Sequence, residues 1–359
     1  MKTLITFILF SFPLAFSTFA SECDLRSPLK VYRPHYAKHF SIDYFKNFKI
    51  LHVDKEQYLL SDSPVQNCEY AGLKIITPVK KVVMMSTTYL PALELIHQEK
   101  SLMGFQGKQN IVSSAFQQGV IKEVAYKLNP EYLQGFKADL IMGYEGNLTG
   151  PKQTQIFKTL KIPVVINKDF EEKNPLARAE WLVFISSFYN QDDQAINIFN
   201  SIQSKYLALK EKNSKFLVKA KVIVGDIQNG HWVTCGGESD LGQMIEDAGG
   251  SLAHKRPSSK TQEINLEEIS LEKTIKKVWL THNMWESKND LVKATKKDSR
   301  YLLITAKNMF NNNLIINSHK ANDYWEMGLQ RPDLLLFDLS KMFHPEEYKE
   351  HKLHWYRKL

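Results

Sequence analysis

Hydrophobic positions in this chain form short runs that alternate with amphipathic segments from residue 80 onward. Runs typical of strands buried on both faces are KKVVMMS at 80–86, KADLIMGY at 137–144 and IPVVIN at 162–167. Helical periodicity marks TTYLPALELIHQ at 87–98 and KQTQIFKTLK at 152–161. Parallel strands need crossover connections, which are usually helices. We therefore predict an α/β lobe in this part of the chain.

The same alternation restarts at Lys219. Strands are predicted for AKVIVGDI at 220–227, KKVWLTH at 276–282 and NLIIN at 313–317. Helices are predicted for SDLGQMIEDAGG at 239–250, ESKNDLVKA at 286–294 and RPDLLLFDLSKMFHP at 331–345. Ser239 or Asp240 is the expected N-cap of the first of these helices. This half of the chain is therefore a second α/β lobe.

A long helical pattern lies between the two lobes. Asn174 is a typical N-cap and Pro175 a typical first helical residue. Apolar residues then recur at helical spacing from Trp181 to Leu209, and the polar segment YNQDD at 189–193 predicts a break into two helices. A helical connection of this kind fixes the separation of two lobes and permits only small hinge motions.

The predicted fold class is α/β, with two Rossmann-like α/β lobes joined by a long connecting helix. An aromatic and β-branched region before residue 79 predicts hairpin strands. The expected parts are a signal peptide at 1–20, an N-terminal α/β lobe at 21–170 with a hairpin extension at 21–78, the connecting helix at 171–215, and a C-terminal α/β lobe at 216–359.

The N-terminus has the features of a secretory signal peptide. Residues 1–20 contain one lysine, an apolar run interrupted by Pro13, and small residues Thr18 and Ala20 before a cleavage site. The apolar run is short for a membrane span. Cys23 follows Glu22 and does not directly follow the predicted cut, so we do not expect a lipid anchor. The sequence thus predicts a soluble protein exported to the periplasm.

Export permits disulfides, and the chain has three cysteines. Cys23 and Cys68 both lie in the N-terminal region, where a bridge between them and two free thiols are equally open alternatives. Cys235 is the odd cysteine. No CxxC spacing is present, so the cysteines predict no zinc site.

Charge and motifs exclude several functions. The net charge is +8, but the basic residues are scattered and form no block, so nucleic-acid binding is not expected. No nucleophile elbow, phosphate-binding glycine loop or dinucleotide fingerprint occurs, and we expect no enzyme and no cofactor. Near the C-terminus, Glu347, His351 and His354 would share one face of a helix and could bind a metal. An exposed terminal helix is the commoner meaning of such a pattern, so no metal site is assigned.

Polar side chains follow the predicted strands, where α/β sheets bind ligands. Ser86, Thr87, Thr88 and Tyr89 follow the first strand and begin a helix. Their hydroxyls and backbone amides suit an anionic or polar ligand group, and simple N-capping explains them equally well.

Aromatic side chains also lie at expected loop positions of both halves. They are Tyr144, Trp232, Tyr324 and Trp325. Aromatics at loop tips are costly to expose unless they contact something. Large flat or macrocyclic ligands need such walls, whereas core packing is the competing interpretation for Trp232 and Trp325.

Four segments carry a resemblance to a known family. They are KKVVMMSTT at 80–88, PLARAEW at 175–181, HWVTCGGESDLGQMIEDAGG at 231–250 and NDYWEMGLQRPDLLLFDLSKMFHPE at 322–346. Together with the two lobes, the connecting helix and the signal peptide, they resemble the helical-backbone (class III) periplasmic substrate-binding proteins of ABC importers for ferric siderophores, haem and cobalamin. The resemblance runs from about Val79 to the C-terminus. Cys235 departs from it, because a proline or similar residue is expected there.

The resemblance implies a monomeric binding protein that captures an iron-chelate or cobalamin-like ligand between the lobes and delivers it to an inner-membrane permease. Arg178 is then a candidate for holding a ligand carboxylate, with a salt bridge to Glu171, Glu172 or Glu180 as the alternative. An exported enzyme, a metal-handling protein and a sensory binding protein on the same scaffold are the alternative functions.

The resemblance also implies an acidic residue on the outer rim of each lobe, which pairs with permease arginines. The candidates are Glu145 in GYEGN and Glu286 in HNMWESKN. Charged contacts at a rim mainly set association rate and register. Both glutamates can also be read as solvated loop charges.

Overall fold

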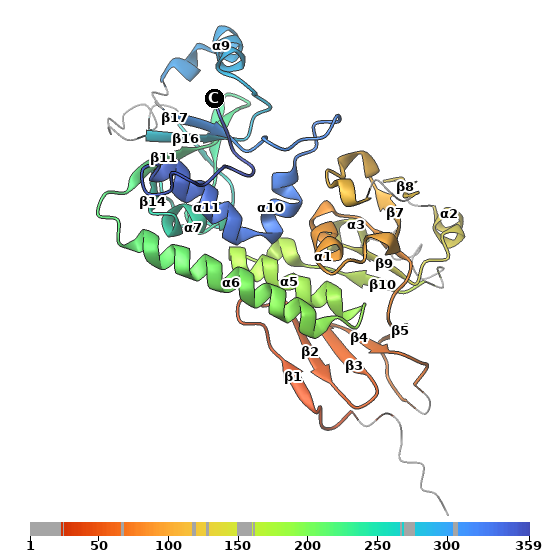
Figure 1. Ribbon diagram of the computed structural model, residues 1–359. Helices are drawn as coiled ribbons and strands as arrows, with labels where there is room; N and C mark the ends of the chain where they lie inside the picture. The colour runs from red at the N-terminus through yellow and green to blue at the C-terminus, as the bar shows by residue number, and fades with distance from the viewer. Residues whose placement is uncertain are drawn as a thin grey trace, which may run out of the picture.

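The computed structural model describes Cys23, 25–65, 68–116, 120–126, 129–148, Leu160, 162–265, Glu268, 277–303 and 308–359. The predicted signal peptide at 1–20 and most of the helix expected at 152–161 lie outside these residues. Two α/β lobes stand on either side of a central pair of helices, and a separate N-terminal sheet packs below them (Figure 1). The predicted fold class is therefore confirmed.

The N-terminal sheet has five strands in the order β1-β2-β3-β4-β5. They are β1 (Lys30–Tyr32), β2 (Phe40–Tyr44), β3 (Lys49–Val53), β4 (Glu56–Ser61) and β5 (Leu73–Ile76). The first four pair antiparallel, as the alternating aromatic and β-branched pattern predicts, and β5 pairs parallel to β4. Phe40 of this sheet packs against Trp181, with the ring centroids 5.0 Å apart, so the sheet shares a core with the central helices.

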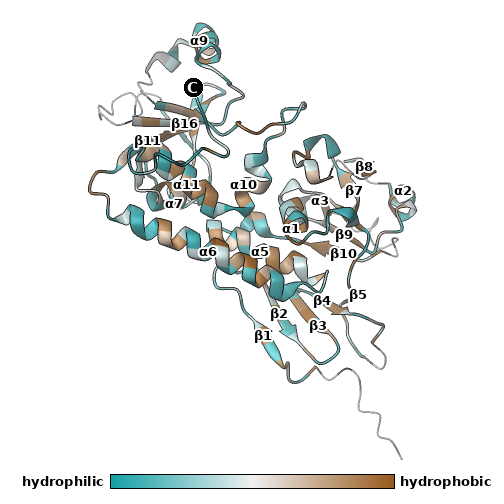
Figure 2. Cartoon of the chain, viewed as in Figure 1, coloured by the Kyte–Doolittle hydropathy of each residue, from teal (hydrophilic) through white to brown (hydrophobic). Residues whose placement is uncertain are grey.

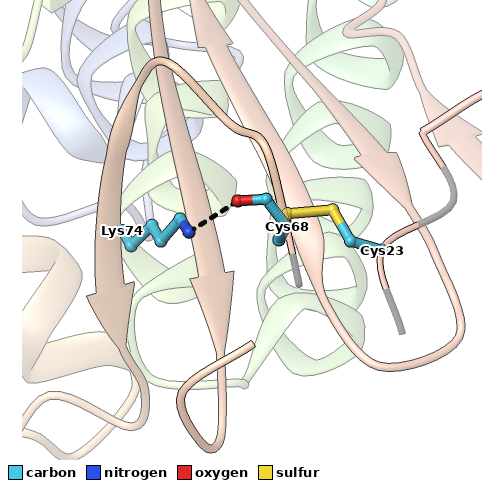
Figure 3. Close-up of a disulfide and its surroundings, with 3 residues drawn as sticks. All are labelled: Cys23, Cys68 and Lys74. Atoms are coloured by element: carbon cyan, nitrogen blue, oxygen red, sulfur yellow. Dashed lines mark hydrogen bonds between the residues drawn. A yellow bond between two sulfur atoms is a disulfide. The ribbon is translucent and has the colours of Figure 1, made fainter. Parts of the chain in front are cut away.

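A disulfide between Cys23 and Cys68 ties the first described residue to this sheet (Figure 3). Lys74 of β5 donates a hydrogen bond from Nζ to the carbonyl oxygen of Cys68, at 3.0 Å. The segment that precedes β1 is thereby held beside β5.

The sheet of the first lobe is parallel, in the order β10-β9-β6-β7-β8. Its strands are β6 (Val82–Met84), β7 (Leu102–Gln106), β8 (Lys122–Val124), β9 (Leu140–Gly143) and β10 (Val164–Ile166). Its helices are α1 (Leu90–Leu95), α2 (Pro130–Gly135) and α3 (Glu145–Leu148), with one-turn 3-10 helices that include η1 (Thr87–Tyr89) and η5 (Asp169–Glu171). The central strands β6 and β9 are buried throughout, which explains their unbroken apolar runs.

The connection between the lobes consists of α5 (Pro175–Ser187) and α6 (Asp192–Ser214). Asn174 caps α5 through its side-chain oxygen, and the chain turns at 188–191, where the break was predicted. The two helices lie side by side, so they do not form one extended rod (Figure 1). Most of α5 is buried in the first lobe, and α6, about 34 Å long at 1.5 Å per residue, passes to the second lobe.

The second lobe repeats the architecture of the first. Its main sheet has the order β14-β11-β16-β17-β18, and only β18 is antiparallel to its neighbour. The strands are β11 (Ala220–Val224), β14 (Gly250–Leu252), β16 (Lys277–Thr281), β17 (Asn308–Asn311) and β18 (Arg357–Lys358). The helices are α7 (Asp240–Asp247), α9 (Lys288–Lys297), η6 (Ser299–Leu303), η7 (Asp323–Trp325), α10 (Met327–Gln330) and α11 (Pro332–Phe343). A small antiparallel sheet, β12 (Asp226–Gln228), β13 (His231–Thr234) and β15 (Gln262–Ile264), covers one end.

Two local predictions for the second lobe are wrong. The strand expected at 313–317 lies earlier, at β17, and the apolar side chains of Leu314 and Ile315 are exposed. The helix expected for the C-terminal histidines is a series of turns at 345–350 followed by an extended segment. Hydrophobic residues otherwise concentrate on the strands and the inner helix faces, as Figure 2 shows. Within the described part of the chain, no helix combines the length and apolarity that a membrane crossing requires.

Candidate ligand site

A cavity of about 630 Å³ lies between the two lobes. Its second-lobe wall comes from the carboxyl ends of β11 and β16 and from the N-terminal half of α7. The facing wall is formed by residues 170–173, which include the end of η5 and the chain after it, and by Arg178 of α5. The ends of parallel strands are where α/β sheets bind ligands, so the cavity occupies the position expected of a binding site.

Arg178 brings a guanidinium into the cavity wall from the first turns of α5. Its Nη2 lies 3.3 Å from Oδ2 of Asp240, and the same nitrogen donates a hydrogen bond to the carbonyl oxygen of Phe170 at 3.5 Å. Its Nε is buried and has no hydrogen-bond partner among the described residues. Arg178 therefore joins the central helices to the second lobe and keeps one donor unused.

The ion-pair partner of Arg178 differs from those considered from the sequence. Glu180 instead accepts hydrogen bonds from the hydroxyl of Tyr32 and from three backbone amides of 35–37. Glu172 accepts hydrogen bonds from the amide of Lys38 and the indole of Trp181. Both glutamates thus fasten the N-terminal sheet to α5. The N-cap of α7 is Ser239, which leaves Asp240 available to Arg178.

Asp226 is a buried acid at the carboxyl end of β11. Its carboxylate accepts hydrogen bonds from Oγ1 of Thr281 at 2.6 Å and from the backbone amide of His282 at 3.1 Å. Burial raises the pKa of Asp226 to about 7, against the lowering effect of these two hydrogen bonds. The floor of the cavity can therefore hold or release a proton near neutral pH.

His282 lines the cavity directly after β16. Its ring centroid lies 6.2 Å from that of Tyr324 and 5.8 Å from that of Trp325. Burial lowers the pKa of His282 to about 4, so the imidazole is neutral at pH 7. Its Nε2 has no hydrogen-bond partner within the described structure. Because this nitrogen is also closed off from solvent, a ligand could reach it only after the surrounding side chains move.

Tyr324 and Trp325 lie in η7 and line the cavity. Asn322 caps this turn by accepting a hydrogen bond from the amide of Tyr324 at 3.0 Å. Tyr324 is only 2% exposed, whereas Trp325 is 46% exposed, and their rings meet edge to face. Trp325 therefore offers an accessible aromatic surface, and Tyr324 supports it from the core.

Glu326, which follows Trp325, bonds the second lobe to the first. Its carboxylate accepts hydrogen bonds from the amides of Val112 and Ser113 at 2.9 and 3.0 Å. The side chain of Asn317 adds bonds to the carbonyl oxygens of Gln109 and Ile111. Burial raises the pKa of Glu326 to about 7. These bonds hold the lobes together on one side of the cavity.

The structure brings only part of the sequence-predicted ligand set to this cavity. Arg178, Tyr324 and Trp325 line it, and Tyr144 contacts a lining residue, Phe170, with ring centroids 6.0 Å apart. The other five are not among the described lining residues: Ser86, Thr87, Thr88, Tyr89 and Trp232.

The segment 86–89 serves packing and local hydrogen bonding. Ser86 bonds Thr88 through their hydroxyls at 3.0 Å and does not cap the helix with its side chain. Thr88 also bonds the buried carboxyl of Asp169. Tyr89 is 1% exposed and belongs to the core of the first lobe.

Trp232 lies within strand β13, although the sequence suggested a loop after a strand. It is 1% exposed, packs against Trp279, and donates its indole N–H to the carbonyl oxygen of Val224 at 2.9 Å. The loop placement expected from the sequence is wrong, because the apolar ring and its polar atom are both satisfied in the core.

The two glutamates predicted to lie on the rims, Glu145 and Glu286, are accessible and ion-paired. Glu145 begins α3 with its side chain 55% exposed, 3.8 Å from Nζ of Lys168. Glu286 lies before α9, with Nζ of Lys320 at 2.7 Å and a guanidinium nitrogen of Arg357 at 3.7 Å. Lys320 lowers the pKa of Glu286, so this carboxylate is charged at neutral pH.

Sequence reasoning missed Asp226, His282 and Asp240 as members of the site. The first two lie at or near the ends of the runs predicted as strands, 220–227 and 276–282, so the position of strand ends was a sufficient signal. Asp240 was considered only as an N-cap, because its approach to Arg178 depends on the packing of α7 against α5.

Comparison with known proteins supports the architecture. No family model matches the chain. An uncharacterized lipoprotein of Methanocaldococcus jannaschii is 25% identical over 306 residues, which cover 80% of this chain and 70% of that protein. A second uncharacterized protein of that organism is 26% identical over 41% of this chain and 47% of its own length.

Solved structures align with both lobes. A periplasmic binding protein of Veillonella parvula aligns with a TM-score of 0.57 and 13% identity, over 86% of this chain and 98% of that one. A periplasmic heme-binding protein of Pseudomonas aeruginosa aligns with a TM-score of 0.56 and 13% identity, over 78% of this chain and 98% of that one. A possible iron-binding (periplasmic solute-binding) protein of Staphylococcus epidermidis aligns with a TM-score of 0.56 and 16% identity, over 74% of this chain and 99% of that one. The fold is that of the two-lobe periplasmic binding proteins of class III.

Proposed function

We propose that this protein is the substrate-binding protein of an ABC importer. It captures a ferric siderophore, haem or a cobalamin-type compound between its lobes and delivers it to an inner-membrane permease. The interlobe cavity, which is lined by Arg178 of α5 and Trp325 of η7, is the observation that carries this proposal. Its volume of about 630 Å³ falls within the range of roughly 300–1,000 Å³ that small-molecule sites occupy.

The chemistry of the cavity favours a large ligand with an acidic group. Trp325 supplies an accessible ring for a flat or macrocyclic surface, and Phe170 is a second exposed aromatic residue in the lining. Arg178 can hold a carboxylate through its planar guanidinium. Its pairing with Asp240 does not exclude this role, because the Arg178 side chain remains 18% exposed in the cavity wall. Neutral His282 adds a polar ring to the cavity lining.

Export to the periplasm and docking to a permease are what the resemblance to periplasmic substrate-binding proteins implies. The signal peptide predicted at 1–20 would direct the chain to the periplasm. The disulfide of Cys23 with Cys68 suits an oxidising compartment. Glu145 and Glu286 would then meet permease arginines, one from each lobe.

A thermal-shift panel on the mature protein tests the proposal. The panel contains haem, ferric siderophores, cobalamin, and the corresponding iron-free chelators as controls. One ligand class should raise Tm in proportion to the logarithm of its concentration, because it binds only the folded state. Turnover of the stabilising compound would indicate the enzyme alternative, and no stabilisation by any class would contradict the proposal.

A further inference from the structure

The C-terminal segment folds back onto α11 and brings two histidines to one buried carboxylate. Asp338 lies near the middle of α11 and is fully buried. Its Oδ1 is 2.8 Å from Nε2 of His351 and 3.4 Å from Nδ1 of His354. The sequence suggested Glu347 as the third member of this group, on a helix that does not form. The carboxylate comes from α11 instead.

We propose that Asp338, His351 and His354 form a zinc site outside the interlobe cavity. The three candidate ligand atoms all lie within 4.8 Å of one another. In tetrahedral zinc sites with Zn–N and Zn–O distances of about 2.0–2.2 Å, ligand atoms are roughly 3.3 Å apart. The two distances from Asp338 Oδ1, 2.8 and 3.4 Å, bracket that separation. Small side-chain shifts are therefore enough to admit the ion.

The surroundings hold each ligand in place. Oδ2 of Asp338 accepts hydrogen bonds from the backbone amides of His354 and Trp355 at 3.0 and 2.9 Å, which fix the carboxylate. The ring of His351 stacks on Phe337, with centroids 3.9 Å apart and planes 12° apart. Such outer contacts orient metal ligands and raise affinity. His351 also lines a groove of about 420 Å³, from which water can supply a fourth ligand.

The ligand set selects the class of ion. Two imidazoles and one carboxylate suit borderline divalent ions such as Zn²⁺, whereas Ca²⁺ and Mg²⁺ prefer sets made of oxygen atoms. An ion here would join α11 to the segment that leads into β18, so it would stabilise the fold of the second lobe.

Zinc binding to the mature protein tests the site. ZnCl₂ is titrated against metal-free wild type, His354→Ala and His319→Ala, with stoichiometry from equilibrium dialysis and Tm measured with Zn²⁺ or EDTA. His354 is suited to substitution because its side chain is 42% exposed. His319 is an exposed loop histidine outside the cluster and serves as the matched control.

Wild type and His319→Ala should bind one Zn²⁺ per chain, with Tm higher by about 3 °C or more at saturating zinc. His354→Ala should bind at least tenfold more weakly, yet keep the Tm of wild type in EDTA to within a few degrees. Equal zinc affinity in wild type and His354→Ala would overturn the proposal, as would the absence of a zinc-dependent rise in Tm. Loss of affinity in His319→Ala would place the site elsewhere and overturn it as well.

Discussion

Arg178 of α5 and Asp240 of α7 form an ion pair within the wall of the interlobe cavity, 3.3 Å from nitrogen to oxygen. Each side chain is less than one-fifth exposed. The pair joins the central helices to the second lobe, and it places a guanidinium in the cavity wall. Burial raises the pKa of Asp240, and the charge of Arg178 opposes that rise.

Substitution of each partner separates the binding role from the structural role. Arg178→Gln should weaken binding of an acidic ligand by tenfold or more, because a charge-assisted hydrogen bond contributes about 1.5–3 kcal/mol. Asp240→Asn should keep ligand affinity within threefold, since the guanidinium remains. Isothermal titration of both variants measures this difference. Equal losses of affinity and of Tm in the two variants would assign Arg178 to structure alone.

Trp325 and Trp232 should respond differently to truncation. Trp325→Ala removes an accessible cavity wall and should weaken ligand binding by about 1–3 kcal/mol with little change in Tm. Trp232→Ala opens a hole in a closed core and should lower the free energy of unfolding by about 3–5 kcal/mol. Ligand titration and urea unfolding measure the two effects. Normal binding by Trp325→Ala would remove this ring from the site.

This contrast shows what the sequence could and could not predict. Strands β6, β9, β11 and β16 were predicted because burial on both faces leaves a continuous apolar run. Whether a side chain near a strand end faces the core or a cavity depends on tertiary packing, so Trp232 was wrongly assigned to a loop. Leu314 and Ile315 were assigned to a strand because they are apolar, although tertiary packing leaves both side chains exposed. The pairing of buried Asp338 with His351 was not predicted, because turns separate the two residues and their spacing is not that of one helix or strand.

Glu326 should make the stability of the closed arrangement depend on pH. Its folded-state pKa is about 7, above the ordinary value of 4.5, so the folded state holds more protons than the unfolded state between these values. This group's contribution is therefore greatest below pH 4.5 and falls as pH rises toward 7, by at most about 1.4 kcal/mol per pH unit. Comparing urea unfolding of wild type and Glu326→Gln from pH 4.5 to 7.5 should show a smaller decline in the variant. Parallel profiles would mean that Glu326 does not titrate in this range.

Glu286 should affect docking and leave ligand binding unchanged. Glu286→Lys replaces an exposed negative charge with a positive one beside Lys320 and Arg357. The resulting group of positive charges would repel permease arginines. Uptake in cells or docking to permease in membranes should slow, most clearly at low salt. Glu211→Lys, at an exposed position of α6, is the matched control and should behave as wild type. Wild-type uptake by Glu286→Lys would remove this residue from the interface, and loss of ligand affinity would reassign it to the cavity.

The most direct test of the central claim is a titration of the mature protein with haem, ferric siderophores and cobalamin, followed by tryptophan fluorescence. The account predicts one-to-one binding of one of these classes at micromolar or lower Kd. The fluorescence should change on binding because Trp325 lines the cavity. The Arg178→Gln/Trp325→Ala double variant should keep its fold and lose at least 100-fold in affinity. Absence of binding by every class at 100-fold molar excess, or unchanged affinity in the double variant, would contradict the account.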